Sequence, residues 1–243
     1  MALPKIATPT YDLKLPSNGK KVAYRPFLVK EEKLLLMAME DGNQSAIAST
    51  LKQIIHNCTD GKVDVETLPM FDIEYLFLQL RIKSVEEVSE FTLKCRECSE
   101  EFNSKINLND VEVKFPEEKQ DFKIQLTSDV GIIMKYPTLA LMSDSSLDVK
   151  KEDNTESLFD MISNCVESIY DEEQVYNDFT KQEVDEFMEN LPQEQFKKIS
   201  KFFENMPKLK HDIEFNCPKC KTKNSITIQG LQDFFDSASL TTT

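Results

Sequence analysis

The chain has 243 residues, of which 40% are apolar and 30% charged, and its formal net charge is −14. This length allows one large domain or two small ones, with a sizeable core. No apolar run approaches the roughly 18 residues that cross a bilayer, which argues against a membrane-spanning protein. The negative field repels phosphate backbones and disfavours nucleic-acid binding. The five glycines form no nucleotide-binding signature, which argues against a phosphate-cradling loop.

The N-terminal third predicts a β-hairpin followed by helices. Residues 8–28 alternate between apolar and polar, and Asn18-Gly19 predicts a turn at residues 17–20 between two antiparallel strands. Residues 29–86 form a predicted helical segment, with helices at 30–39, after Asn43 and at 73–85. Because the third of these helices is apolar nearly all round, we expect it to lie at the centre of the core.

The rest of the chain predicts a β segment, a linker and a second helical segment. Residues 87–136 alternate like strands, although 131–136 fit either a strand or the start of a helix. Residues 143–155 are mainly Ser, Asp, Lys and Asn and predict a linker. Residues 156–208 read as helical, with an apolar face from Leu158 to Ile169 and a capping box at Thr180–Glu183. Residues 209–236 end in a short predicted helix at 231–235, before a Ser/Thr tail that is expected to be disordered.

Two short stretches repeat one pattern, in which an alternating strand runs into a Cys-x-x-Cys turn and a second strand follows. They are Phe91-Thr-Leu-Lys-Cys95-Arg-Glu-Cys98 and Ile213-Glu-Phe-Asn-Cys217-Pro-Lys-Cys220. Each turn, called a knuckle below, offers two thiolates, which is half of a tetrahedral zinc site. We interpret Cys95, Cys98, Cys217 and Cys220 as one closed structural zinc site that holds two remote parts of the chain together.

The wide separation of the two knuckles leaves a second arrangement open. The knuckles are much farther apart than the halves of a compact zinc ribbon, so each could pair with another copy in an intermolecular site. Since one cysteine pair lies in each half of the chain, we favour a single composite domain over residues 1–243. The expected fold class is α+β, with an N-terminal β-hairpin, a helical core and a zinc-ribbon-like β module made from the two knuckles.

Other uses of the cysteines fit the sequence less well. A redox Cys-x-x-Cys opens a helix after a buried strand, whereas both pairs here are followed by strand-like residues. Disulfides are expected after a secretory leader, and the first residues do not form one. Cys58 and Cys165 lie on apolar stripes and are expected to be reduced core residues.

Catalysis is the poorer interpretation of this composition. The only two histidines, His56 and His211, stand in no catalytic spacing. His211 lies six residues before Cys217, close enough to raise a mixed-ligand site, but with four cysteines available we expect it at a strand edge. The acidic pairs and triplets are typical of solvated faces. No Gly-x-Ser-x-Gly or His-Glu-x-x-His motif is present, and a four-cysteine site leaves no coordination position for substrate.

A phenylalanine-rich stripe from Phe187 to Phe203 allows two interpretations. Such stripes are most often part of a hydrophobic core, but this one could also be a partner-binding surface. A folded Phe202→Asp variant that had lost an assembly contact would contradict the core interpretation.

Several segments together resemble the baseplate hub proteins of T4-like contractile-tailed phages, a group that includes a hub subunit and a hub assembly catalyst. They are Met1–Ile6, Arg25-Pro-Phe27, Glu31–Leu35, the Phe71-Asp-Ile-Glu-Tyr75-Leu-Phe-Leu stretch and the paired knuckles. The resemblance implies a non-enzymatic protein used while the tail baseplate is built. It would act in the host cytoplasm with other baseplate and tail hub proteins, and either stay in the virion or leave after assembly. A reducing cytoplasm suits thiolate ligands.

Three hypotheses follow from the sequence. The first is a structural or assembly component of a phage baseplate hub, braced by zinc. The second is a zinc-ribbon module that binds protein or nucleic acid, and the net charge argues against the nucleic-acid version. The third is a metal or redox enzyme, which would need reactive dithiols.

Overall fold

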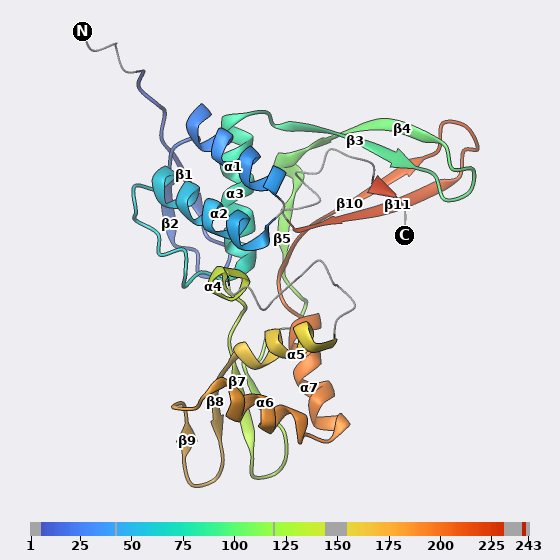
Figure 1. Cartoon of the computed structure of the whole chain (residues 1–243). Helices are drawn as coiled ribbons and strands as arrows, with labels where there is room; N and C mark the ends of the chain where they lie inside the picture. The colour runs from blue at the N-terminus through green and yellow to red at the C-terminus, as the bar shows by residue number, and fades with distance from the viewer. Residues whose placement is uncertain (1–5, 42, 119, 144–154, 231–239, 242–243) are drawn as a thin grey trace.

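The computed structural model of the chain describes residues 6–41, 43–118, 120–143, 155–230 and 240–241. A helical body carries a projecting arm of two β-hairpins and, below it, a second lobe (Figure 1). The strands are β1 (Tyr11–Lys14), β2 (Lys21–Tyr24), β3 (Val88–Lys94), β4 (Glu101–Asn107), β5 (Glu112–Lys114), β6 (Lys123–Gln125), β7 (Gly131–Met134), β8 (Val166–Tyr170), β9 (Val175–Tyr176), β10 (Lys208–Asn216), β11 (Lys223–Gln229) and β12 (Leu240–Thr241). The helices are α1 (Val29–Asp41), α2 (Gln44–Cys58), α3 (Met70–Ser84), α4 (Leu139–Ser143), α5 (Thr155–Asn164), α6 (Lys181–Glu189) and α7 (Gln193–Glu204), with a short 3-10 helix at Leu108–Asp110. The α+β class is confirmed.

The predicted N-terminal hairpin is confirmed. Strands β1 and β2 pair antiparallel from Tyr11 opposite Tyr24 to Lys14 opposite Lys21. Gly19 has a φ of +68° in the connecting turn, a backbone conformation that glycine adopts without a steric penalty. Asn18 contributes to the same turn, because its side-chain oxygen accepts a hydrogen bond from the Lys20 amide at 2.9 Å.

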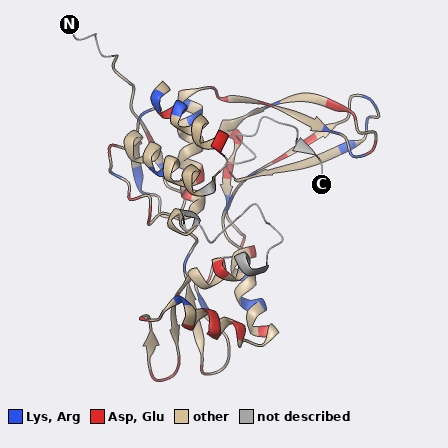
Figure 2. Cartoon of the chain, in the orientation of Figure 1, with Lys and Arg blue, Asp and Glu red and all other residues tan. Residues whose placement is uncertain are grey.

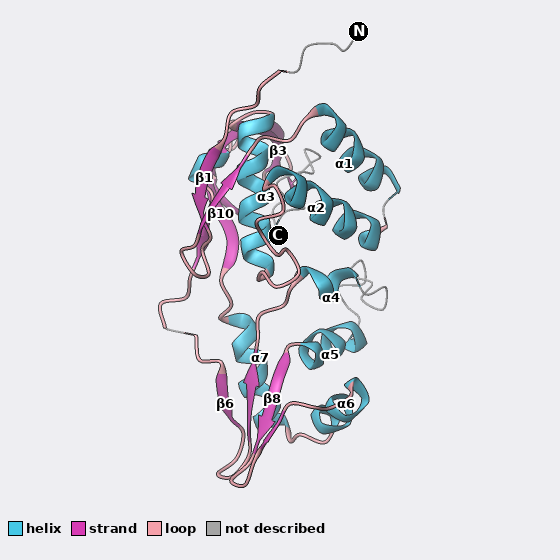
Figure 3. Cartoon of the chain, turned by 90° about the vertical axis from the view of Figure 1, so that its left-hand side faces the viewer, coloured by secondary structure: helices cyan, strands magenta, loops and turns pink. Residues whose placement is uncertain are grey.

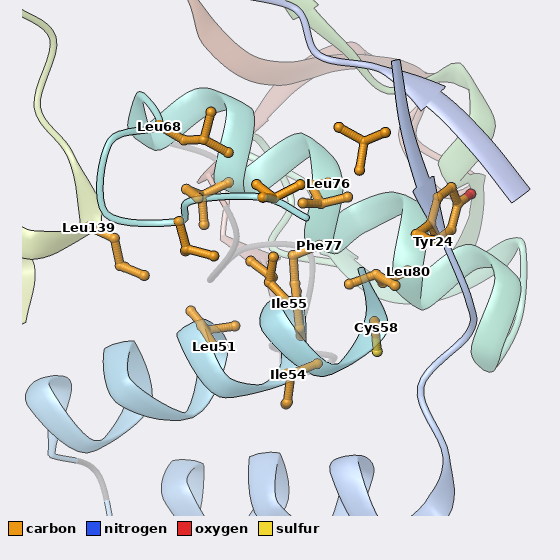
Figure 4. Close-up of a cluster of buried hydrophobic side chains, with 14 of the residues drawn as sticks. Tyr24, Leu51, Ile54, Ile55, Cys58, Leu68, Leu76, Phe77, Leu80 and Leu139 are labelled. Carbon is orange, nitrogen blue, oxygen red and sulfur yellow. The ribbon is translucent and has the colours of Figure 1, made fainter. Parts of the chain in front are cut away.

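The helical body has three layers, in which α2 lies between α1 and α3. The α2 helix begins where the side chain of Asn43 accepts hydrogen bonds from the amides of Ser45 and Ala46, which are otherwise unpaired at a helix start. Leu51 and Ile55 point from α2 toward α3, whereas Ile54 points to the opposite side of α2, and all three belong to one continuous apolar cluster (Figure 4).

Helix α3 is the central helix, as its all-round apolar sequence predicts. Ile73 and Phe77 face the cluster beneath α2, while Leu78 and Ile82 belong to a second cluster that extends into the arm. The Ile73, Phe77 and Leu78 side chains have no exposed surface. Because α3 contributes to both clusters, the body and the base of the arm are packed as one unit.

Two buried carboxylates attach the N-terminal hairpin and α1 to this core. Asp72 accepts hydrogen bonds from the amide and hydroxyl of Ser17 in the hairpin turn. Glu31 accepts from the Leu28 amide at 2.8 Å and pairs with Arg25 at 3.1 Å. Both acidic side chains are fully buried. These hydrogen bonds replace the hydrogen bonds to water that each carboxylate loses on burial.

The arm consists of two hairpins that face each other. Strands β3 and β4 pair from Val88 opposite Asn107 to Lys94 opposite Glu101, and β10 and β11 pair over an equal length. Alternate side chains of both hairpins point inward and join the second cluster. Near the tips, Phe102 meets Phe215 edge to face, with ring centroids 5.2 Å apart. The β-module expectation is therefore confirmed.

The described residues of 115–136 and 155–207 form the second lobe, called the inserted lobe below, whereas α4 packs against α2 of the body through Leu139. In the chain, the lobe lies between two strands that pair with each other. Strand β5 precedes the lobe, β10 follows it, and they pair from Lys114 opposite Lys208 to Glu112 opposite Lys210. Inside the lobe a sheet of order β6-β7-β8-β9 packs with α5, α6 and α7 around a third apolar cluster. Figure 3 shows the lobe at the opposite end of the molecule from α1.

Most of the chain's excess of acidic over basic residues falls within the inserted lobe. Figure 2 shows acidic residues along α6 and in the loop between β8 and β9, whereas the arm carries both signs. On the arm, these charges pair across strands, as in Lys105–Glu90 at 2.7 Å and Lys223–Glu214 at 2.7 Å.

Aromatic rings join the inserted lobe to the body. Phe71 of α3 packs against Tyr136 with centroids 5.2 Å apart, and Tyr136 stacks on Phe202 of α7 at 5.8 Å. The amide of Met70 also donates to the carbonyl of Pro137 at 2.9 Å. Phe202 is buried, and Phe187, Phe196 and Phe203 pack against the same cluster. The core interpretation of the phenylalanine stripe is thus confirmed.

The helical prediction over residues 156–208 is wrong in one part. Helix α5 ends at Asn164, and Val166–Tyr170 is strand β8, paired with β7. The apolar spacing at 162, 165, 166 and 169 fits a helix, but Val166 and Ser168 are also inward at a strand's period of two. Pairing with β7 decides in favour of the strand. The same pairing shows that the ambiguous 131–136 segment is mainly strand.

The capping box of α6 is confirmed, because Thr180 and Glu183 each accept a hydrogen bond from the other's amide.

Two predicted features lie outside the described residues. They are nearly all of the 143–155 linker and the short helix at 231–235. Most of the Ser/Thr tail also lies outside, and its described part, β12, pairs parallel with β3.

Candidate metal centre

The structure brings the four predicted cysteines together at the tip of the arm. Cys95 Sγ lies 3.6 Å from Cys220 Sγ, and Cys98 Sγ lies 3.5 Å from Cys217 Sγ. All four sulfurs lie within 4.8 Å of one another. Sulfurs bound at about 2.3 Å to one zinc ion would be about 3.8 Å apart in a regular tetrahedron. The cluster therefore has the size of a four-sulfur metal site, and it closes within one chain.

Both knuckles adopt the same local structure. In each, a loop of six residues connects the two strands of the hairpin. The amide of the first cysteine donates a hydrogen bond across the loop at 2.9 Å, from Cys95 to the Glu100 carbonyl and from Cys217 to the Thr222 carbonyl. The residue after each second cysteine has a positive φ, +55° at Ser99 and +63° at Lys221. Its amide donates back to the first cysteine's carbonyl at 3.0 Å. These tight loops turn both sulfurs of a pair to the same side.

Asn224 connects the two knuckles, a role that the sequence pattern did not reveal. Its amide group lies 3.6 Å from Cys95 Sγ and donates to the Thr222 carbonyl at 2.8 Å, while its oxygen accepts from the Arg96 amide at 3.2 Å. The side chain is buried in the inward row of β11 with Ile226 and Ile228. The sequence signal that could have revealed this role is that Asn224 is polar but alternates in phase with Ile226 and Ile228, on the face of the strand expected to be buried.

The knuckles' surroundings affect the four thiols differently. Hydrogen bonding to the side chain and amide of Thr222 lowers the pKa of Cys220 to about 6. The Cys98 amide lowers the pKa of Cys95 in the same way. The Glu100 amide acts to lower the pKa of Cys98, but burial and hydrogen bonding with the three other thiols outweigh it and raise the pKa to about 12. A crowded cluster with two acidic thiols is suited to binding a cation, which releases the remaining protons.

An exposed ion pair connects the two knuckles. Lys219, between the cysteines of the second knuckle, pairs with Glu100 of the first at 2.7 Å. Cys95 and Cys217 are buried, Cys98 is half-buried and Cys220 is exposed. The site thus has a buried inner half and an accessible outer half, through which an ion can enter.

The geometry disfavours the alternative uses of these cysteines. All six cysteines are free thiols, and the sulfur separations far exceed the roughly 2.05 Å of a disulfide. Each knuckle continues into a strand, not into the helix that follows a redox pair.

The remaining candidate residues lie away from this cluster. His211 is inside β10, opposite Ile228, and is not part of the four-residue group. His56 lies near the end of α2, where its carbonyl accepts a hydrogen bond from the Gly61 amide at 2.9 Å. Cys58 and Cys165 are buried, as predicted, and burial raises the pKa of each thiol, to about 11 and about 12. In the described part of the chain, no helix has the length and apolar character that a bilayer span requires.

Comparison with known proteins identifies a family. A family model described as T4 bacteriophage base plate protein matches residues 8–236. No curated protein and no solved structure matches the chain. The family match includes both knuckles, the helical body and the inserted lobe, which is nearly the whole sequence. The chain therefore belongs to the T4 bacteriophage base plate protein family.

Proposed function

We propose that the chain is a non-enzymatic structural or assembly protein of the baseplate hub of a contractile phage tail, braced by a zinc ion. The observation that carries this proposal is the family match over residues 8–236. The shape of the molecule supports it, because an arm, a helical body and an acidic inserted lobe offer separate surfaces to neighbouring proteins (Figure 1).

Zinc is the metal that suits the donor set. Four cysteine sulfurs at tetrahedral spacing are the ligand set of structural zinc sites, while calcium and magnesium take oxygen ligands. Cys95, Cys98, Cys217 and Cys220 would fill all four positions and leave none for a substrate. The ion would supply a cross-link between hairpins whose paired cysteines are 119 and 125 residues apart in the chain.

A cross-linked arm is useful to an assembly part because it fixes two separate hairpins as one surface. Without the ion, the tips are joined by the Lys219–Glu100 pair, the Asn224 hydrogen bonds and the Phe102–Phe215 contact. The exposed ion pair contributes little by itself. We therefore expect the ion to set the rigidity of the arm.

The proposed partners are other baseplate and tail hub proteins, met in the host cytoplasm during assembly. Quantitative mass spectrometry of purified phage tails tests this proposal. A fixed number of copies per tail supports a hub subunit, and presence in assembly intermediates with absence from finished tails supports an assembly factor. Absence from both, with normal tails formed by phage lacking the gene, would refute the proposal.

The zinc component has its own test. Metal analysis combined with native mass spectrometry should find one zinc in each monomer mass. Metal found only in dimers would instead indicate a site shared between copies. A preparation that is fully reduced, folded and free of metal after incubation with zinc would refute this component without affecting the family assignment.

A further inference from the structure

The outer face of α1 is unusually apolar for a surface helix. Val29, Leu36 and Met37 are 81%, 54% and 56% exposed, and Leu34 is also exposed. The opposite face is buried against the body through Glu31, Leu35 and Ala38. Because α2 already separates α1 from α3, α1 is the outermost layer of the helical body, at the end opposite the inserted lobe (Figure 3). Such a face is suited to another protein surface.

The exposed charges of α1 are arranged in two halves. Lys30 and Lys33 lie in its first half, and Glu40 and Asp41 at its end. Lys33, Leu36, Met37 and Glu40 have the spacing i, i+3, i+4 and i+7, which places them in one stripe on the same side of the helix. The stripe therefore has a basic end, an apolar centre and an acidic end.

A stripe of this kind is complementary to a second copy of itself that runs in the opposite direction. If a two-fold axis passes between Leu36 and Met37, then Lys33 and Glu40 are equally distant from it, on opposite sides. Lys33 of each copy then faces Glu40 of the other, and the apolar centres meet. The helix dipoles also oppose each other favourably in this arrangement. A two-fold interface repeats each contact twice, so a single self-complementary stripe is sufficient.

We propose that two copies of the chain associate through α1, packed antiparallel around a two-fold axis at Leu36 and Met37. This inference concerns a surface far from the cysteine cluster and does not depend on zinc or on the baseplate role. The helix has 13 residues and is about 20 Å long, so it covers less than the ~800 Å² per partner of a standard stable interface. The dimer is therefore weak, and it forms as the protein concentration rises into the micromolar range and above.

Sedimentation velocity of the full-length, metal-loaded chain over a wide concentration range tests the proposal. The native chain shows a reversible monomer–dimer equilibrium. Lys33→Glu and Glu40→Lys each place like charges opposite one another twice, and each weakens the dimer on the order of tenfold. Leu36→Glu, at the apolar centre, abolishes it. Lys197→Glu, an equivalent exposed charge reversal on α7, is the matched control and leaves the equilibrium unchanged.

A mixture of the two charge variants gives the sharpest result. Lys33→Glu chains and Glu40→Lys chains each repel themselves, yet each is complementary to the other, so their mixture forms a heterodimer with about native affinity. The double variant with both changes regains the homodimer. Circular dichroism confirms that all variants are folded, which is expected because the altered side chains are exposed. A native chain that stays monomeric throughout, or single variants that dimerise normally, or a mixture that stays monomeric would each overturn the proposal.

Discussion

Replacing Cys217 by serine should remove the metal cross-link with little change in side-chain volume. Cys217 is the most buried of the four clustered cysteines and lies 3.5 Å from Cys98 Sγ. Serine binds zinc poorly, so the variant should lose the ion while keeping the hairpin and its loop hydrogen bonds. The expected result is a lower free energy of unfolding that no longer depends on zinc.

The size of the effect follows from the loop that the metal closes. Cys98 and Cys217 are 119 residues apart. A cross-link that closes a loop of this length stabilises the folded state by about 5 kcal/mol in the chain-entropy model. In a chain of 243 residues, each kcal/mol shifts the melting temperature by about 2–4 °C, so loss of the ion should lower it by roughly 10–20 °C.

The assay is thermal unfolding in the presence of a reductant, with and without a zinc chelator. The native chain should show the full shift, and Cys217→Ser should melt at the same lower temperature in both conditions. Cys165→Ala is the matched control, because Cys165 is also a buried thiol but lies in the inserted lobe. It should lose some stability by truncation yet keep the full chelator-dependent shift. A native chain that binds zinc but melts at the same temperature after its removal would refute the reasoning.

Three further predictions concern the packing of the body and the inserted lobe. Burial alone would raise the pKa of Glu31, but hydrogen bonds from a backbone amide and an arginine hold it below its ordinary value. Glu31 therefore stabilises the fold above pH 4.5, and this stabilisation is lost as the pH falls through the lowered pKa. Glu31→Gln should lower the free energy of unfolding by about 2 kcal/mol at pH 7. It should also make stability depend less on pH at the acidic end of a stability–pH curve. Phe202→Ala should cost about 3–5 kcal/mol in urea unfolding, whereas Phe115→Ala, at an exposed ring, should cost under about 1 kcal/mol; equal costs would contradict the core role of Phe202. Gly131→Ala would place a methyl group against the Tyr170 ring on the neighbouring strand. It should lower the free energy of unfolding by about 1–3 kcal/mol, but clearly less in a Tyr170→Ala background. Identical costs in the two backgrounds would rule out this clash.

The local features of the fold could be predicted because short-range interactions decide them. The Asn18-Gly19 turn, the Asn43 cap and the Thr180–Glu183 capping box involve residues within a few positions of one another. The same holds for the Cys-x-x-Cys loops, which their own backbone hydrogen bonds close. The strand at Val166–Tyr170 was mispredicted because its apolar spacing fits both a helix and a strand, and the distant partner β7 decides between them.

The sequence by itself therefore determined the two knuckles, the N-terminal hairpin, the central apolar helix and the family resemblance that the family match confirms. Only the tertiary structure decided that the two cysteine pairs meet within one chain, that Asn224 joins them and that residues 115–207 are inserted between paired strands. It also decided which side of the leucine-rich α1 stays exposed. The physical reason is that these features depend on contacts and burial between residues far apart in the chain, and the periodicity of a single segment carries no information about which distant segment it will meet.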